Sequence, residues 1–145
     1  TPKDYYYLLL GQYAQTSRLI DSSANRGLVV ADTNSLVTKA YYDYYLKESP
    51  VQDEETDTFD NLFASILSKE KWDLILFAEP VGAYVNDGFR DMSMADEAIR
   101  SDFSSYLKKL KEQCLAHIPT VYLAGSYLDN YQAAKEAIDM IYQAD

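Results

Sequence analysis

Two short stretches of the chain concentrate side chains that could do chemistry, and the first follows an apolar run. Asp32, Thr33 and Asn34 come directly after Leu28–Ala31. A carboxylate at the end of a buried strand is a common way to hold Mg²⁺ beside a phosphate group. The same residues could instead cap the helix that follows, because Asp and Asn are preferred N-cap residues. The local pattern leaves both interpretations open.

The second stretch places four different functional groups within seven residues. It contains the aromatic ring of Tyr84, the amide of Asn86, the carboxylate of Asp87 and the guanidinium of Arg90. A guanidinium binds two phosphate oxygens at once, an aromatic face stacks on a flat heterocycle, and a carboxylate accepts from sugar hydroxyls. The alternative is an Asn-Asp-Gly turn in which Arg90 pairs with a neighbouring acid such as Asp91.

Both stretches follow segments that the apolar pattern predicts to be buried strands. Short apolar runs without alternation are typical of strands covered on both faces. Stretches with apolar residues at helical spacing separate them. The predicted strands are residues 28–31, 74–78 and 120–124, and the predicted helices are residues 4–24, 35–46, 59–69, one opening at Ser93 and one opening at Ser126.

This alternation predicts an α/β fold with a parallel sheet, in one segment spanning residues 1–145. In such sheets ligands bind beyond the carboxyl ends of the strands. The residues expected at those ends are 32–34, 79–90 and 125–127. The two chemical stretches therefore belong to the edge of the sheet where a ligand would sit.

Composition limits the kinds of partner. The net charge is −10, which argues against binding to nucleic acid or to an anionic membrane surface. No apolar run approaches the roughly 18–20 residues of a membrane span. The single cysteine, Cys114, excludes an intrachain disulfide or a thiolate-rich metal site. We expect a cytoplasmic protein whose partner is a small molecule, with self-association left open.

The chain resembles the ribosylnicotinamide kinase domain of bacterial NadR proteins, which are P-loop kinases of the AAA-type ATPase class. Three motifs carry the resemblance, from about Leu8 to Tyr142. Residues 29–34, Val-Val-Ala-Asp-Thr-Asn, match an apolar strand followed by Asp-Thr-Asp. Residues 84–90, Tyr-Val-Asn-Asp-Gly-Phe-Arg, match Trp-Val-Asp-Asp-Gly-Leu-Arg, and residues 126–131 match a motif after the last strand.

The resemblance implies transfer of the γ-phosphate of ATP to the 5′-hydroxyl of ribosylnicotinamide, in NAD biosynthesis. Asp32 would be the Mg²⁺-associated carboxylate, with Thr33 and Asn34 lining the acceptor side. Arg90 would neutralise the transferring phosphate. In the substrate-binding loop, which includes Asn86, Tyr84 would stack on the nicotinamide ring and Asp87 would hold the ribose hydroxyls.

The chain departs from the family pattern in one major respect, because no glycine is followed by lysine. It therefore lacks the phosphate-binding loop G-x-x-x-x-G-K-[ST]. The resemblance implies a three-layer domain whose first, central strand and P-loop lie upstream of this chain, and we expect these 145 residues alone to be inactive. Asn34 and Asn86 also replace aspartates.

Three alternatives follow from these departures. The chain could belong to a nicotinamide-nucleotide sensor or regulatory module without catalysis, because two negative charges are lost at Asn34 and Asn86. It could act on another nucleoside. It could also be a truncated domain whose strands close up directly and whose exposed edges self-associate.

Overall fold

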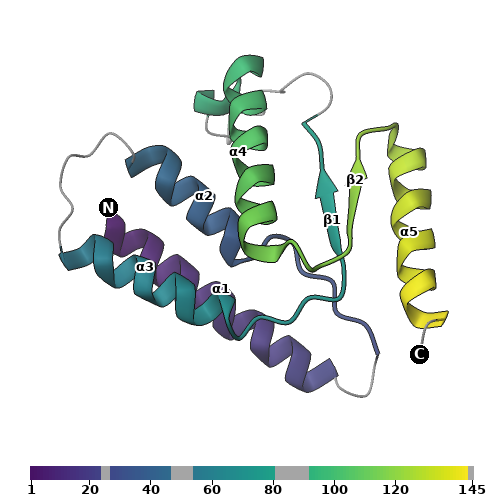
Figure 1. The fold of residues 1–145 in the computed structure, drawn as a ribbon, viewed down its shortest axis with the longest axis horizontal. Coiled ribbons are helices and arrows are strands. Elements are labelled where there is room, and N and C mark those ends of the chain that lie inside the picture. Colours follow the sequence, from purple (N-terminus) through teal and green to yellow (C-terminus); the bar gives the residue numbers. More distant parts are fainter. Residues whose placement is uncertain (24–26, 47–53, 81–91, 144–145) are drawn as a thin grey trace. The chain divides into compact units, whose positions relative to one another are not determined.

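The computed structural model describes residues 1–23, 27–46, 54–80 and 92–143. These residues form two compact units, Thr1–Glu70 and Lys71–Asp145. The first unit is helical and the second contains the sheet, and each is described by itself (Figure 1). Residues 84–90, which carry four of the predicted site residues, lie outside the described residues.

The helical unit consists of α1 (Pro2–Ser23), α2 (Ser35–Leu46) and α3 (Glu54–Leu67). The long α1 packs against both other helices. Its Leu9 is fully buried, as is Phe59 of α3, and Tyr42 of α2 stacks on Phe59 with ring centroids 3.8 Å apart. Aromatic stacking of this kind adds to the area buried by the rings. These contacts hold α2 against α1 and α3, and residues 32–34 directly precede α2.

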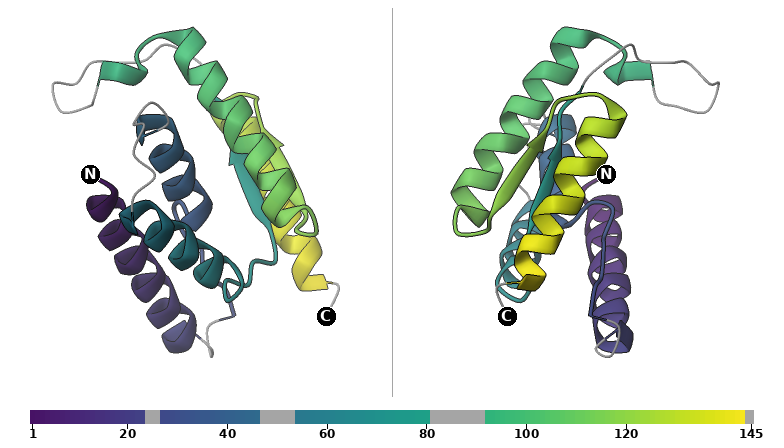
Figure 2. Two further views of the ribbon diagram at one scale, coloured as in Figure 1. Left: turned by 60° about the vertical axis from the view of Figure 1, so that its left-hand side comes forward. Right: turned by 90° about the vertical axis from the view of Figure 1, so that its right-hand side faces the viewer.

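The second unit contains β1 (Ile75–Ala78), the 3-10 turn η1 (Met92–Met94), α4 (Glu97–Leu115), β2 (Thr120–Leu123) and α5 (Tyr127–Gln143). The two strands are parallel, with Ile75 opposite Thr120 and Ala78 opposite Leu123. The strand pair lies between α4 and α5 (Figure 2). Phe77, Leu110 and Leu115 are buried here. The parallel pairing and the α/β class agree with the prediction.

The predicted strand at residues 28–31 is wrong. The described residues form a two-stranded sheet, and residues 28–31 belong to no strand. Leu28 is 49% exposed and Val30 is 69% exposed, so burial on both faces is also wrong. A strand exists only where a neighbour takes up its backbone hydrogen bonds, and none of the described segments does so. The third predicted strand is therefore not present in the described residues.

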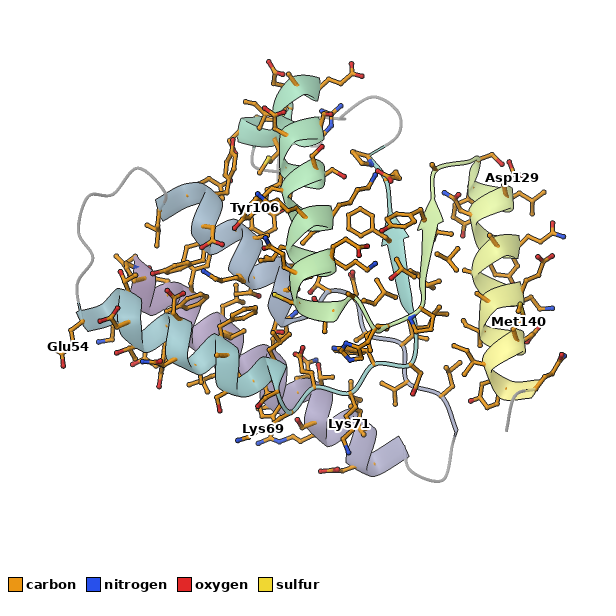
Figure 3. The ribbon with its side chains drawn as sticks, viewed as in Figure 1. Glu54, Lys69, Lys71, Tyr106, Asp129 and Met140 are labelled. Atoms are coloured by element: carbon orange, nitrogen blue, oxygen red, sulfur yellow. The ribbon has the colours of Figure 1, made fainter. Side chains whose placement is uncertain are left out.

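Two predicted helix starts are also corrected. The third helix begins at Glu54 (Figure 3) rather than at Phe59. The sequence pattern missed its first turn because that turn is acidic and lacks the apolar spacing that indicates a helix. Helix α4 begins after Asp96 rather than at Ser93, because the Asp96 carboxylate accepts from the backbone N–H groups of Ala98 and Ile99. Ser93 lies in η1.

Candidate functional site

The predicted residues Asp32, Thr33 and Asn34 form one turn at the N-terminus of α2. Asp32 and Thr33 are exposed, whereas Asn34 is half-buried. The Asn34 Oδ1 atom accepts from the backbone N–H groups of Leu36 at 3.1 Å and Val37 at 3.4 Å. Asn34 is thus the N-cap of α2, and the prediction that a residue of this stretch caps the following helix is confirmed for Asn34. Asp32 is presented to solvent beside it.

Thr33 has a backbone conformation that its side chain disfavours. Its φ is +68°, and among the described residues it is the one non-glycine residue with positive φ. A β-branched residue in this region is strained, and such strain persists only where the surroundings hold it in place. The turn is therefore maintained by its neighbours.

The main neighbour is Gln12 on α1, which sequence reasoning missed. One end of its side-chain amide lies 2.7 Å from Thr33 Oγ1 and the other end lies 2.9 Å from Thr38 Oγ1. With the amide oxygen toward Thr33, the same group also bonds the backbone N–H and C=O of Asn34. The sequence did offer one indication of this role. Gln12 lies three residues after Leu9, which places it on the same, inward-facing side of α1.

A second polar contact ties the start of α2 to the end of the unit. The hydroxyl of Ser35, which is 1% exposed, donates to Glu70 Oε2 at 2.6 Å. A hydrogen bond between a hydroxyl and a carboxylate is short and strong. It keeps the first residue of α2 in place, and with it the turn at residues 32–34.

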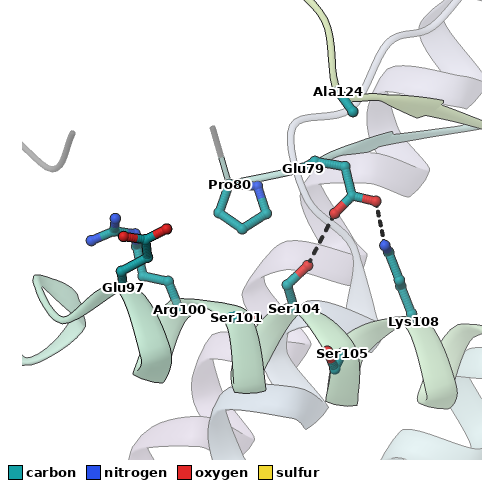
Figure 4. A pocket seen from close by; sticks show the side chains of 9 residues that line it. All are labelled: Glu79, Pro80, Glu97, Arg100, Ser101, Ser104, Ser105, Lys108 and Ala124. Atoms are coloured by element: carbon teal, nitrogen blue, oxygen red, sulfur yellow. Dashed lines mark hydrogen bonds and ion pairs between the residues drawn. The ribbon is translucent and has the colours of Figure 1, made fainter. Parts of the chain in front are cut away.

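The second unit has a polar pocket beyond the carboxyl ends of β1 and β2 (Figure 4). Glu79 follows β1, and its carboxylate forms an ion pair with Lys108 of α4 and accepts from the Ser104 hydroxyl at 3.5 Å. The pocket has a volume of about 350 Å³. Its other lining residues are Pro80, Glu97, Arg100, Ser101, Ser105 and Ala124. The α4 side chains were not predicted as site residues.

The residues after β2 form a compact start to α5. The Ser126 hydroxyl donates to Asp129 Oδ2 at 2.6 Å and accepts from the Asp129 backbone N–H at 3.2 Å. This confirms the pairing of Ser126 with Asp129 at the start of the last helix. The Gly125 N–H donates to Asn130 Oδ1 at 2.9 Å, and a Cβ on Gly125 would lie 3.1 Å from Asp129 Cβ. A side chain at this position would therefore require Asp129 to shift by a few tenths of an ångström.

The remaining predicted site residues, Tyr84, Asn86, Asp87 and Arg90, lie outside the described residues. Within the part of the chain that is described, no group of three or more His, Cys, Asp or Glu residues could hold a metal ion. Asp32 thus offers one exposed carboxylate, with the Thr33 hydroxyl beside it in sequence. A cation there would need further ligands from a substrate.

The helices and the parallel strand pair are compatible with an α/β fold of the P-loop type. In such folds the ligand binds beyond the carboxyl ends of the strands. The profile of the AAA domain family matches residues 4–129, and the chain belongs to that family. The family supports a P-loop nucleotide-binding function. No curated protein and no solved structure matches the chain. No helix within the described ranges has the length and apolar character needed to cross a membrane.

Proposed function

We propose that the chain is the downstream part of a P-loop kinase domain that phosphorylates the 5′-hydroxyl of ribosylnicotinamide, giving nicotinamide mononucleotide. Membership of the AAA domain family supports the P-loop class. The motifs at residues 29–34, 84–90 and 126–131 support the substrate by resemblance. In this proposal the enzyme is cytoplasmic, and an upstream segment supplies the P-loop that the printed sequence lacks.

The observation that carries the proposal is the exposed carboxylate of Asp32 on a strained and supported turn. The strain at Thr33 is retained because Gln12 and the Asn34 cap compensate for it. Strained turns of this kind cluster at functional sites. Here the turn presents Asp32 to solvent, where a phosphate-bound cation could approach it.

The donor set at this turn fits Mg²⁺ as kinases hold it. Mg²⁺ is usually bound by one or two carboxylates together with substrate phosphates, rather than by a cage of protein ligands. Asp32 supplies the carboxylate, and ATP would supply the phosphate oxygens. When bound, the ion neutralises charge on the phosphates during transfer. Asp32 therefore orients the cation, and Thr33 and Asn34 line the acceptor side.

The residues of the second motif complete the proposed site. Arg90 would neutralise the transferring phosphoryl group, which needs positioning and electrostatic stabilisation more than covalent help. Tyr84 would stack on the nicotinamide ring, Asp87 would bind the ribose hydroxyls, and Asn86 would belong to the substrate-binding loop. These roles come from the resemblance, since the residues lie outside the described part of the chain.

A coupled ATP-consumption assay with ribosylnicotinamide tests the proposal on the complete protein that contains this chain. We expect turnover, and a kcat lowered by more than about tenfold in Asp32→Asn because one metal-orienting charge is lost. Asp21→Asn, an exposed acid-to-amide change in the same unit, is the matched control and should leave kcat unchanged. We expect no turnover from the 145-residue chain alone. An unchanged kcat in Asp32→Asn would remove Asp32 from the site.

A sensor without catalysis is the second candidate. The observation that favours it is Asn34, which stands where the family has a second aspartate and whose oxygen is engaged with the backbone of α2. Calorimetry separates the two candidates, because a sensor binds nicotinamide mononucleotide without consuming ATP. If the protein consumes ATP only with a different nucleoside, the kinase class holds and the substrate changes.

A further inference from the structure

The polar pocket beside Glu79 lies wholly in the second unit and is not used by the proposed kinase chemistry. Glu79 follows β1, Ala124 follows β2, and one side of the pocket is a face of α4 (Figure 4). Ser101, Ser104 and Ser105 share this face with Lys108, because residues three and four apart lie on the same side of a helix. A cavity of about 350 Å³ is within the size range of small-ligand sites.

Three charged side chains of this pocket, Glu79, Lys108 and Arg100, are engaged with protein partners. The Glu79 carboxylate pairs with the Lys108 ammonium. The Arg100 guanidinium donates through Nη1 to the backbone carbonyls of Met94 at 3.2 Å and Ala95 at 2.7 Å. The described part of the lining has two acidic and two basic side chains, so its formal charge is zero. These described residues therefore give no net attraction to a phosphate or an ammonium, and binding either one at Glu79 or Lys108 would compete with their ion pair.

Hydrogen-bonding capacity nevertheless remains around the Glu79–Lys108 pair. A carboxylate offers about four lone-pair sites, and Glu79 uses one oxygen for Lys108 and the other for Ser104. Ser101 and Ser105 are exposed, so their hydroxyls face solvent. Each hydroxyl can both donate and accept. The pocket can therefore take up several neutral polar groups without separating its ion pair.

The pocket offers little carbon surface to a ligand. Among the described lining residues, the apolar ones are Pro80 and Ala124, and neither presents an aromatic face. An aromatic base would gain little from stacking here, and a lipid chain would gain little from burial. A ring that carries hydroxyl groups around its edge meets the donors and acceptors of the walls without needing an apolar partner.

We propose that this pocket binds a neutral, hydroxyl-rich ring such as a sugar. Neighbouring ring hydroxyls donate to the Glu79 carboxylate and accept from Lys108 and from the serines of α4. The ion pair with Lys108 holds the carboxylate in place for this contact. The site uses no residue of the turn at 32–34, so a failure to bind sugars would leave the proposed kinase function untouched.

Amide NMR spectra of the full 145-residue chain, titrated with methyl β-D-ribofuranoside, test this proposal. We expect saturable shifts at Glu79, Ser101 and Ser104, with affinity in the millimolar range. Tetrahydrofurfuryl alcohol, which has the same type of ring with a single hydroxyl, should give no saturable shift. In Glu79→Gln the apparent Kd should rise about tenfold, because a charged acceptor becomes a neutral one.

Two further variants complete the test. Ser104→Ala removes one hydroxyl without disturbing the ion pair and should weaken binding about threefold, which keeps the proposal testable if Glu79→Gln does not fold. Ser65→Ala, an exposed change in the other unit, should leave the Kd unchanged. The proposal is overturned if the sugar gives no saturable shift. It is also overturned if inorganic phosphate alone shifts these residues, or if both pocket variants bind as tightly as the wild type.

Discussion

The side-chain amide of Gln12 lies 2.7 Å from the hydroxyl of Thr33, the residue whose φ of +68° is disfavoured for a β-branched side chain. The two residues are 21 positions apart and come from α1 and from the turn before α2. The amide also reaches Thr38 at 2.9 Å. A single glutamine thus joins the strained turn to two helices, and the exposed Asp32 sits beside this junction.

Replacing Gln12 by alanine should destabilise the protein by about 1–2 kcal/mol, because two hydrogen bonds are lost and partly buried polar atoms lose their partners. Urea unfolding followed by circular dichroism measures this as a lower midpoint at constant slope. Gln15→Ala on the same helix is the matched control, since Gln15 is exposed, and it should change the stability by less than about 0.5 kcal/mol. Equal effects of the two substitutions would contradict the bridging role.

Thr33→Gly tests the strain, because glycine adopts positive φ without steric penalty. In the wild type the substitution removes both the strain and the bond to Gln12, so the two effects oppose each other. In a Gln12→Ala background the bond is already gone, and Thr33→Gly should stabilise the protein by about 1 kcal/mol. The measurement is the difference between the two backgrounds in a double-mutant cycle. A destabilisation of equal size in both backgrounds would show that the turn stores no strain.

The sequence predicted the turn at residues 32–34 but not what holds it. An apolar run followed by Asp-Thr-Asn and then a helical pattern marks the turn locally, and the Asn34 cap is readable in the same way. The contact of Gln12 with Thr33 depends on how α1 packs, and spacing along the chain does not encode that packing. Periodicity therefore marks the turn, whereas its support is a tertiary property.

The strand predicted at residues 28–31 is absent for a similar reason, because strand formation also depends on tertiary contacts. Apolar and β-branched residues favour a strand, but strand formation requires a neighbouring backbone, which local composition cannot supply. Residues 75–78 and 120–123 have the same apolar character and do form strands, because each is the other's partner in register. Residues 28–31 have no such partner strand among the described residues, and Leu28 and Val30 are exposed.

Asn34→Ala and Asn34→Asp separate the capping role of this residue from its charge. Alanine cannot accept from the backbone N–H groups of Leu36 and Val37, so α2 should lose about 1 kcal/mol. Aspartate caps as well as asparagine and adds a negative charge at a helix N-terminus, so its stability should stay within about 0.5 kcal/mol of the wild type. Urea midpoints of the three proteins measure this order. Destabilisation by aspartate as large as by alanine would contradict it.

Lys39 should make the helical unit sensitive to alkaline pH. Burial alone would lower the pKa of its ammonium, but hydrogen bonds to Asp43 at 2.6 Å and Asp60 at 3.1 Å outweigh burial and raise the pKa above 10.5. Because the folded pKa exceeds the unfolded one, this stabilisation is complete below the unfolded pKa and is lost as pH rises through the folded pKa. Lys39→Met should therefore lower the free energy of unfolding by about 1–2 kcal/mol at pH 8. The difference in unfolding free energy between the variant and the wild type should disappear above the folded pKa. Lys69→Met, at an exposed position, should differ little from the wild type in unfolding free energy, and the difference should not change with pH. A pH-independent difference for Lys39→Met as well would contradict the ion-pair account.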